Sequence, residues 1–365
     1  MKIAVVGCGA VGSFYGARLA RAGHEVHFLL RSDYESVRRR GVRIQSPEGD
    51  FEVRPQCAQR PEEIGPADLV LIGLKTTAND QFFRLLPPLV NPATAVLTLQ
   101  NGLGNEEQLA SLFPSEQIMG GLCFVCLNRV APGVIQHLGY GQVVLGEFQR
   151  PPTSRTHELA ARFCEAGVPC TVTENLAQAH WEKLVWNIPF NGLGVAGAAG
   201  PEVLERLCFP GPHEPLSLGA ARGPSQLTTH PRPLTSATMM NVRKSETTGP
   251  GRPSSSFSAS RPASLFPCLT TDELLADAGW ARLVLELMLE VISAARALGF
   301  RVPDAFADEQ IARTRKMGAY KASTLLDFER GKPLELESLF LEPLRQAGRA
   351  GVAMPRLSAL CAVLT

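Results

Sequence analysis

The chain opens with MKIAVVGCGAVG over residues 1–12, and this stretch decides the fold. Residues 2–6 have the apolar, β-branched character of a short buried strand. Three glycines then follow with the spacing G-x-G-x-x-G, and apolar residues over 11–22 recur with the period of a helix. A second apolar run over 25–30 supplies the next strand. The sequence therefore predicts a strand–turn–helix–strand unit with parallel strands.

Each glycine of the turn has a physical purpose in this context. The first permits the tight turn, the second leaves room for a pyrophosphate, and the third lets the helix pack closely on the strand. The free N–H groups at the start of the helix would then face the phosphates. The turn is therefore predicted to bind a dinucleotide through Gly7, Cys8, Gly9, Ala10, Val11 and Gly12.

The end of the second strand indicates which dinucleotide binds. An NAD site has Asp or Glu there for the ribose 2′-hydroxyl, whereas this chain has Leu29, Leu30 and then Arg31. The absence of a carboxylate at the end of the strand and the presence of the Arg31 guanidinium favour a 2′-phosphate, so we predict NADP (NADPH). The alternative is an ordinary surface arginine with Asp33 as its partner, and that alternative leaves NAD open.

Composition limits the class of protein. A length of 365 residues predicts two domains, and 45% hydrophobic with 19% charged residues is typical of a globular protein. The net charge of +1 gives no reason to expect nucleic acid or a membrane surface as a partner. No apolar run is long enough to span a bilayer, and the apolar start is interpreted as a strand and not as a signal peptide.

The nine cysteines are odd in number and scattered. Without an export signal, we expect reduced thiols in a cytoplasmic protein. Cys123 and Cys126 form a lone C-x-x-C pair inside a strand-like run, without a second pair or suitably spaced histidines. Packing is therefore favoured over a redox or zinc role, and no metal is expected.

Polar residues follow two further predicted strands. The run 67–74 ends at Lys75, and the run 94–99 ends just before Asn101. Open α/β sheets bind ligands beyond the carboxyl ends of their strands, so both residues are candidates for cofactor or substrate binding. The alternative for Asn101-Gly102 is a simple turn, which this dipeptide favours.

The pattern becomes helical after residue 173. We predict an α/β protein with an N-terminal Rossmann-type dinucleotide-binding domain over 1–173 and an all-helical substrate-binding domain over 174–365. One amphipathic helix is expected over 274–298. Residues 201–268 carry eleven of the 28 prolines and no clear period, so they are predicted to be a disordered insertion whose ends lie close together.

Three polar residues, Lys183, Asn187 and Asn191, are spaced four apart and would share one face of a helix. The positions around them are mostly apolar, and buried polar groups cost free energy unless they are paired. This pattern suits a wall that holds a small polar substrate in a cleft between the domains. A solvated helix face is the alternative.

These residues together resemble the ketopantoate reductase family (2-dehydropantoate 2-reductases). The resemblance covers the chain except for the insertion. The matching stretches are the glycine turn, Lys75, Gln100-Asn101-Gly102, the Lys-x3-Asn-x3-Asn spacing, Ser323 to Asp327, Gly331 to Glu337, and Gly351-Val352-x-x-Pro355. The chain departs from the family's Thr-Glu-Ile-Asp motif at Leu334 and Glu337.

The resemblance implies reduction of 2-dehydropantoate to pantoate by NADPH, in pantothenate biosynthesis. Arg31 and Lys75 would lie near the phosphates and Asn101 near the nicotinamide. Lys183 would protonate the alkoxide, since an ammonium stabilises the charge that forms there. The substrate would contact Asn187, Asn191 and Ser323.

Glu335 would bind the substrate side and orient Lys183, although a surface carboxylate is the alternative reading of that residue. Two other functions stay open: reduction of another branched 2-oxo acid, and an idle NADP-binding protein impaired by the insertion. The sequence also leaves the oligomeric state open, with a homodimer as one option.

Overall fold

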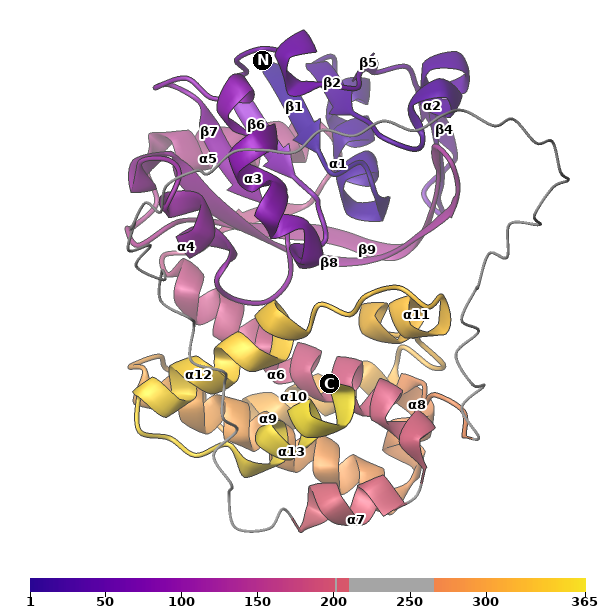
Figure 1. The fold of residues 1–365 in the computed structure, drawn as a ribbon, viewed down its shortest axis with the longest axis vertical. Helices are drawn as coiled ribbons and strands as arrows, with labels where there is room; N and C mark the ends of the chain where they lie inside the picture. The colour runs from indigo at the N-terminus through magenta and orange to yellow at the C-terminus, as the bar shows by residue number, and fades with distance from the viewer. Residues whose placement is uncertain (201, 210–265) are drawn as a thin grey trace, which may run out of the picture. The chain divides into compact units, whose positions relative to one another are not determined.

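The computed structural model describes residues 1–200, 202–209 and 266–365. All ten strands of the described residues lie before residue 173, and every described element after that residue is a helix (Figure 1). The predicted fold class, a Rossmann-type α/β domain followed by a helical region, is confirmed. None of the helices in the described ranges has the length and apolar character needed to cross a membrane.

The strands form a single mixed sheet. Its order is β4-β3-β9-β8-β7-β6-β1-β2-β5, and β10 pairs with β9. Strands β1, β2, β5, β6, β7 and β8 pair in parallel, so their carboxyl ends share one edge. The strand bounds are β1 Lys2–Val6, β2 Glu25–Leu29, β3 Val42–Gln45, β4 Phe51–Val53, β5 Gln56–Ala58, β6 Leu69–Ile72, β7 Ala95–Thr98, β8 Ile118–Ala131, β9 Val134–Glu147 and β10 Cys170–Val172.

Helices cover both faces of the sheet, because successive strand residues point to opposite sides. Ile3 and Val5 of β1 pack in one apolar core with residues of α1 (Ala10–Arg21) and α5 (Ser154–Glu165). Ala4 and Val6 pack in a second core with residues of α3 (Phe82–Leu85) and α4 (Asn105–Ala110). The remaining short helices of this region are α2 Tyr34–Arg40, η1 Pro61–Glu63, η2 Thr76–Gln81, η3 Pro87–Leu89 and η4 Ser115–Gln117.

Strands β8 and β9 form a long antiparallel hairpin, and its pairing is irregular. The register shifts between Phe124 and Val125, between Cys126 and Leu127, and between Arg129 and Ala131. Tyr140 on β9 adopts a left-handed backbone conformation with φ of 61°. Bulges of this kind bend a strand and redirect its side chains, which matters here because the hairpin borders the candidate site.

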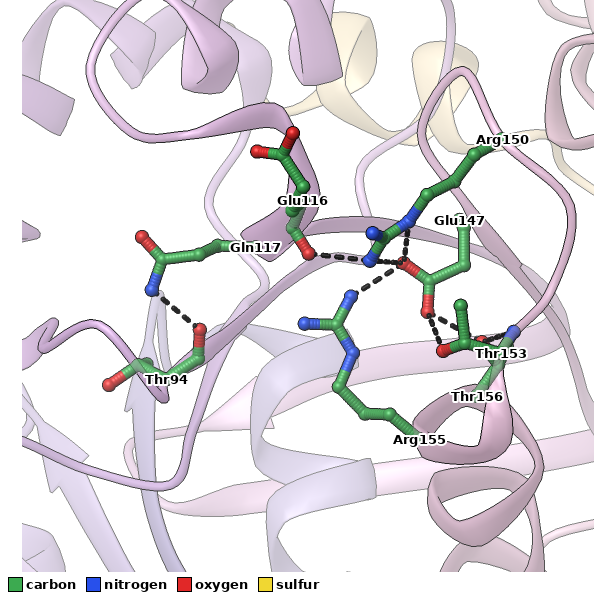
Figure 2. Close-up of polar contacts among 8 residues, drawn as sticks. All are labelled: Thr94, Glu116, Gln117, Glu147, Arg150, Thr153, Arg155 and Thr156. Carbon is green, nitrogen blue, oxygen red and sulfur yellow. Dashed lines mark hydrogen bonds and ion pairs between the residues drawn. The ribbon is translucent and has the colours of Figure 1, made fainter.

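A buried carboxylate fixes the junction between β9 and α5 (Figure 2). Glu147 is 1% exposed and accepts hydrogen bonds from Thr156 Oγ1 at 2.5 Å, Arg155 at 2.5 Å and Arg150 at 2.8 Å. These contacts outweigh the desolvation of the carboxylate, so the pKa of Glu147 is lowered. Thr153 closes the first turn of α5 with Thr156 as a capping box. The cluster is structural, because its hydrogen bonds satisfy a charge that burial would otherwise destabilise.

The helical region is built around α6 (Leu176–Ala196), which continues through Pro189. Its apolar residues lie in one core with those of the surrounding helices. The other elements are η5 Gly197–Ala199, α7 Glu202–Cys208, α8 Thr271–Ala276, α9 Ala278–Ala297, α10 Ala305–Arg315, α11 Ser323–Glu329, η6 Glu337–Leu341, α12 Glu342–Arg349 and α13 Pro355–Leu364.

The single helix expected over 274–298 is two helices. Asp277 interrupts the pattern in an extended conformation, and its side chain accepts hydrogen bonds from the backbone N–H groups of Gly279 and Trp280. This is N-capping of α9, and it ends α8 one residue earlier. Hydrophobic periodicity continues across the break because the apolar faces of both helices pack in the same core.

The prediction of a disordered insertion from residue 201 is wrong for residues 202–208, which form α7. Val203 and Leu207 lie one turn apart on that helix and are each 1% exposed in the helical core. The apolar i, i+4 pair packs one face of this short helix into the core. A Cβ on Gly200 would lie 2.8 Å from the Phe266 ring, so these two residues lie close together, as expected for the ends of the interval. Residue 201 and residues 210–265 lie outside the described residues.

Candidate active site

The glycine turn after β1 has the geometry of a dinucleotide site. Gly7 has φ of +96°, a conformation that favours glycine. A Cβ on Gly12 would lie 2.3 Å from the Gly7 carbonyl oxygen, so the helix could not pack as closely with a larger residue. A Cβ on Gly9 would meet nothing within 4 Å, which leaves that face of the turn open. The turn and the N–H groups that begin α1 therefore fit a pyrophosphate.

Cys8, Ala10 and Val11 complete the turn and are each half-buried. The Cys8 thiol points back into the fold, with its sulfur 3.5 Å from the carbonyl oxygens of Val5 and Leu29. Burial, together with Cys57 and Asp33 nearby, raises the pKa of Cys8. These residues contribute backbone groups to the open side of the turn.

Arg31 at the end of β2 is exposed, and it forms no ion pair with another described residue. Asp33 is 6% exposed and binds the guanidinium of Arg129, with Nε 2.9 Å from Oδ2. Burial opposes the charge on Asp33, but the bonds from Arg129 and Ser32 prevail and lower its pKa. The suggested Arg31–Asp33 pairing is therefore wrong: the carboxylate nearest the strand end is bound elsewhere, and Arg31 is free.

Lys75 follows β6 by three residues and joins the two regions of the chain. Its ammonium lies 2.8 Å from Glu335 Oε2 and 3.0 Å from Asp327 Oδ2. The other oxygen of Glu335 accepts the backbone N–H of Thr76 at 2.9 Å. Partial desolvation disfavours the charge on Lys75, but the two carboxylates outweigh that effect and raise the pKa of Lys75. Glu335 is thus held by Lys75 and Thr76 and does not bond directly to Lys183.

Lys183 lies on α6 and contacts the sheet through Asn101. Its Nζ donates a hydrogen bond to Asn101 Oδ1 at 2.7 Å and lies 5.5 Å from the centre of the Phe124 ring. Burial lowers the pKa of Lys183, and the charges of Cys123 and Glu335 partly oppose that effect. The residue is therefore a cation whose proton is released more readily than that of an exposed lysine.

Amide side chains support the loop that carries Asn101. Asn105 Nδ2 donates to the Asn101 carbonyl oxygen at 3.1 Å, and its own Oδ1 accepts from Asn79 at 3.0 Å. Gln100 Nε2 donates to Asn79 at 2.7 Å. A Cβ on Gly102 would lie 2.4 Å from the Ser338 carbonyl oxygen, so glycine lets this loop approach η6. The position of Asn101 is therefore fixed from both regions of the chain.

Asn187 and Asn191 share the face of α6 that carries Lys183, as their spacing predicted. Asn191 is 2% exposed, and its Nδ2 donates a hydrogen bond to the backbone carbonyl of Asn187 at 3.0 Å. Its Oδ1 accepts hydrogen bonds from Ser323 Oγ at 3.3 Å and from the backbone N–H of Thr324 at 3.0 Å. The side chain of Asn187 makes no hydrogen bond to another described residue. Asn191 thus anchors the start of α11, whereas the Asn187 amide is free to bind a ligand.

Sequence reasoning gave no role to Asp327, Ser338 or Phe124. Asp327 contacts Lys75, and Ser338 Oγ donates to Thr76 Oγ1 at 2.9 Å across the two regions. Asp327 lies in the stretch 323–327 that carried the family resemblance, so its position four residues after Ser323 could have identified it as a candidate. Nothing local marks Ser338 or Phe124, because both acquire their roles from the packing of distant segments.

The glycine turn, the ammonium and the free amide fit a reductase that takes hydride from a nicotinamide dinucleotide and acts on a small keto acid. Comparison with known proteins agrees. The family model for ketopantoate reductase PanE/ApbA matches residues 3–150, and the model for its C-terminal part matches residues 258–365. The chain belongs to the ketopantoate reductase family.

Three relatives resemble the chain over nearly their whole length. A 2-dehydropantoate 2-reductase of Nostoc sp. is 35% identical, covering 98% of this chain and 92% of that protein. The crystal structure of 2-dehydropantoate 2-reductase from Geobacter metallireducens is 40% identical, with a TM-score of 0.78 over 100% of this chain and 99% of that one. The corresponding structure from Methylococcus capsulatus is 31% identical, with a TM-score of 0.75 and coverage of 100% and 96%.

Proposed function

We propose that this protein reduces 2-dehydropantoate to pantoate with NADPH, as a cytoplasmic enzyme of pantothenate biosynthesis. The observation that carries the proposal is the 2.7 Å hydrogen bond from Lys183 to Asn101, which fixes an ammonium on the same face of α6 as Asn187. A cation and a neutral amide suit an anionic 2-oxo acid, since one stabilises its charge and the other orients it. Domains over 1–173 and 174–365 would meet at this site.

NADPH is favoured over NADH because the end of β2 offers a free guanidinium. Arg31 is exposed and without an ion pair among the described residues, while Asp33 is bound to Arg129. Arg31 is therefore available to a 2′-phosphate, and the open face of Gly9 to the pyrophosphate. When bound, the cofactor supplies the hydride that reduces the C2 carbonyl.

Lys183 is assigned as the general acid. Its Nζ would donate a proton to the oxygen on C2 as negative charge develops there, and it would stabilise that charge before the transfer. Asn101 accepts a hydrogen bond from the same nitrogen and so fixes its direction. The lowered pKa of Lys183, which burial causes, makes the proton easier to transfer.

Substrate binding is assigned to Asn187 and Ser323, with Asn191 in support. Asn187 can donate a hydrogen bond to the carboxylate of 2-dehydropantoate, and Ser323 Oγ, whose proton goes to Asn191, can accept one from the hydroxyl group of that substrate. Asn191 accepts a hydrogen bond from Ser323 at 3.3 Å, and its own amide group is bonded within the protein. It therefore positions Ser323 and does not bind the substrate itself. Glu335 contributes charge: it raises the pKa of Lys183 and is fixed by Lys75.

One experiment distinguishes this function from reduction of another branched 2-oxo acid and from an idle NADP-binding protein. NADPH absorbance is followed with 2-dehydropantoate, with other branched 2-oxo acids and with no acid. The proposal requires 2-dehydropantoate to have the highest kcat/KM. A different branched acid with the highest value would make the chain a related reductase. Binding of NADPH without turnover of any acid would make it an idle NADP-binding protein.

A further inference from the structure

Two buried ionisable side chains lie near the site without a part in the proton transfer. His180 on α6 and Glu106 on α4 are 6% and 4% exposed, and His180 Nε2 lies 3.0 Å from Glu106 Oε1, a hydrogen-bond distance. Replacing such a buried pair by apolar residues of similar volume is often neutral or stabilising. Stability of the fold is therefore not a sufficient reason for the pair, and the direction of its hydrogen bond needs another explanation.

The pair joins the two elements that also position Lys183 and Asn101. Lys183 follows His180 by three residues on α6, so the two side chains are neighbours on that helix. On the other side, Asn105 begins α4 directly before Glu106 and donates a hydrogen bond to the Asn101 carbonyl at 3.1 Å. These elements are thus connected both by the contact between His180 and Glu106 and by the 2.7 Å bond from Lys183 to Asn101.

The sheet leaves room for the carboxylate and for the start of α6. A Cβ on Gly120 of β8 would lie 2.5 Å from Glu106 Oε1 and 2.7 Å from Cδ2 of Leu176, the first residue of α6. A Cβ on Gly146 of β9 would lie 2.9 Å from the Leu176 Cβ. Glycine at both positions lets these groups lie directly on the strands. The helix is therefore held at its first turn, and the pair fixes its orientation one turn later, next to Lys183.

We propose that His180 and Glu106 are a positioning pair for the general acid of the reductase. Their hydrogen bond fixes α6 against α4, and this keeps the Lys183 ammonium at Asn101, in the place from which it protonates the C2 oxygen. The pair itself neither contacts the substrate nor transfers a proton. The inference rests on the proposed function, since it requires Lys183 to be the acid. A displacement of about 1 Å in a reacting group can cost about 100-fold in rate, so a small shift of the helix matters.

Two double variants separate the hydrogen bond from the space that the pair fills. His180→Leu with Glu106→Leu, the Leu pair, keeps the interior filled with apolar side chains and removes the bond. His180→Gln with Glu106→Gln, the Gln pair, removes the ionisable groups and keeps a donor and an acceptor. With 2-dehydropantoate, we expect kcat to fall about 10–100-fold in the Leu pair and to stay close to the wild-type value in the Gln pair. The KM for NADPH should change in neither, because the glycine turn is not altered.

The Leu pair in a Lys183→Met background shows whether the pair acts through the lysine. A positioning pair has no further effect on the residual kcat once Lys183 is absent, whereas disturbed substrate binding or folding lowers it again. Glu107→Gln is the matched control, because Glu107 is the next residue on α4, is exposed and forms no ion pair with another described residue. It should leave kcat unchanged. Thermal unfolding of each variant measures any loss of folded protein.

A cavity beside the pair allows an independent test. His180 lines a cavity of about 470 Å³ together with Glu107, Glu174 and Phe300. In His180→Ala, free imidazole can enter this cavity and replace the lost side chain. It should restore kcat in that variant and have no effect on Lys183→Met. This test does not use the Leu pair, so it decides the question even if the Leu pair does not fold. Stabilisation of His180→Ala by imidazole without recovery of kcat would overturn the proposal.

Other outcomes also overturn the positioning role. It fails if the Leu pair keeps the wild-type kcat, if the Leu and Gln pairs lose activity equally, or if the Leu pair lowers kcat again in the Lys183→Met background. If no 2-oxo acid is reduced, the proposed function has failed instead. The ¹⁵N NMR signal of the Lys183 ammonium, assigned by its absence in Lys183→Met, then decides the pair. A signal that shifts in the Leu pair and stays in place in the Gln pair supports positioning, and any other pattern rejects it.

Discussion

Replacing Lys75 by Met should destabilise the protein in a way that depends on pH. Lys75 lies 2.8 Å from Glu335 and 3.0 Å from Asp327, whose side chains are only 4% and 10% exposed. Breaking a buried ion pair by removing one partner costs about 3–5 kcal/mol. The lysine itself is 49% exposed and screened by water, so we expect a loss of about 2–3 kcal/mol. For a chain of this size that lowers Tm by about 3–4 °C.

The pH dependence identifies the cause. Two carboxylates without a cation between them repel each other, and protonation of one relieves the repulsion. The folded variant therefore binds a proton more readily than its unfolded chain, so its stability rises as pH falls. The difference from wild type should shrink between pH 7.5 and pH 5, measured by urea unfolding without cofactor.

Lys321→Met is the control for this experiment. Lys321 is 45% exposed and lies 2.7 Å from Glu329, but Glu329 is 37% exposed. Such a surface pair contributes less than about 1 kcal/mol. Equal losses in the two variants, or a loss in Lys75→Met that does not change with pH, would refute the argument that two buried carboxylates depend on Lys75.

Four further variants test the site and the fold. Lys183→Met should lower kcat by about 10²–10⁴-fold with little change in NADPH affinity, and near-normal turnover would remove its role as general acid. In the wild type, kcat/KM should fall as pH rises through the pKa of Lys183, because the deprotonated lysine cannot act as the acid, and burial lowers this pKa below 10.5. Glu335→Gln should move this fall to lower pH, because the charge of Glu335 raises the pKa of Lys183. Arg31→Ala should raise the KM for NADPH and leave NADH use unchanged, and steady-state kinetics with both cofactors would detect a shared loss. Leu207→Ala should cost about 2–5 kcal/mol in urea unfolding, and no effect would mean that α7 is not part of the core.

Strong local signals gave the dinucleotide fold and the polar face of α6 from sequence alone. The glycine turn is constrained within twelve residues, so its strand and helix follow from spacing and backbone sterics. Lys183, Asn187 and Asn191 lie on one helix, and a period of 3.6 residues aligns them without knowledge of any other segment. Neither prediction needed long-range information.

The partners of these groups could not be predicted, because packing between distant segments sets them. Lys75 and Glu335 are 260 residues apart, and the chain has 35 acidic residues that could have paired with that lysine. From the helix spacing alone, Asn187 and Asn191 were equally good candidates for substrate binding. Only the position of α11 distinguishes them, because its first residues donate hydrogen bonds to the side-chain oxygen of Asn191. The Asn187 side chain has no such partner among the described residues.

The pairing of Lys75 with Glu335 also sets the order in which parts of the site form while the chain is being synthesised. The glycine turn and its two flanking strands are complete by Leu29, whereas Glu335 emerges 260 residues after Lys75. At about 5–20 residues per second, a ribosome takes roughly 13–50 s to make that interval. Lys75 therefore stays in water while the sheet folds around it. A nascent chain shorter than residue 335 has the dinucleotide turn but lacks the carboxylate clamp, so ribosome-bound intermediates of this enzyme acquire the two halves of their site at separate times.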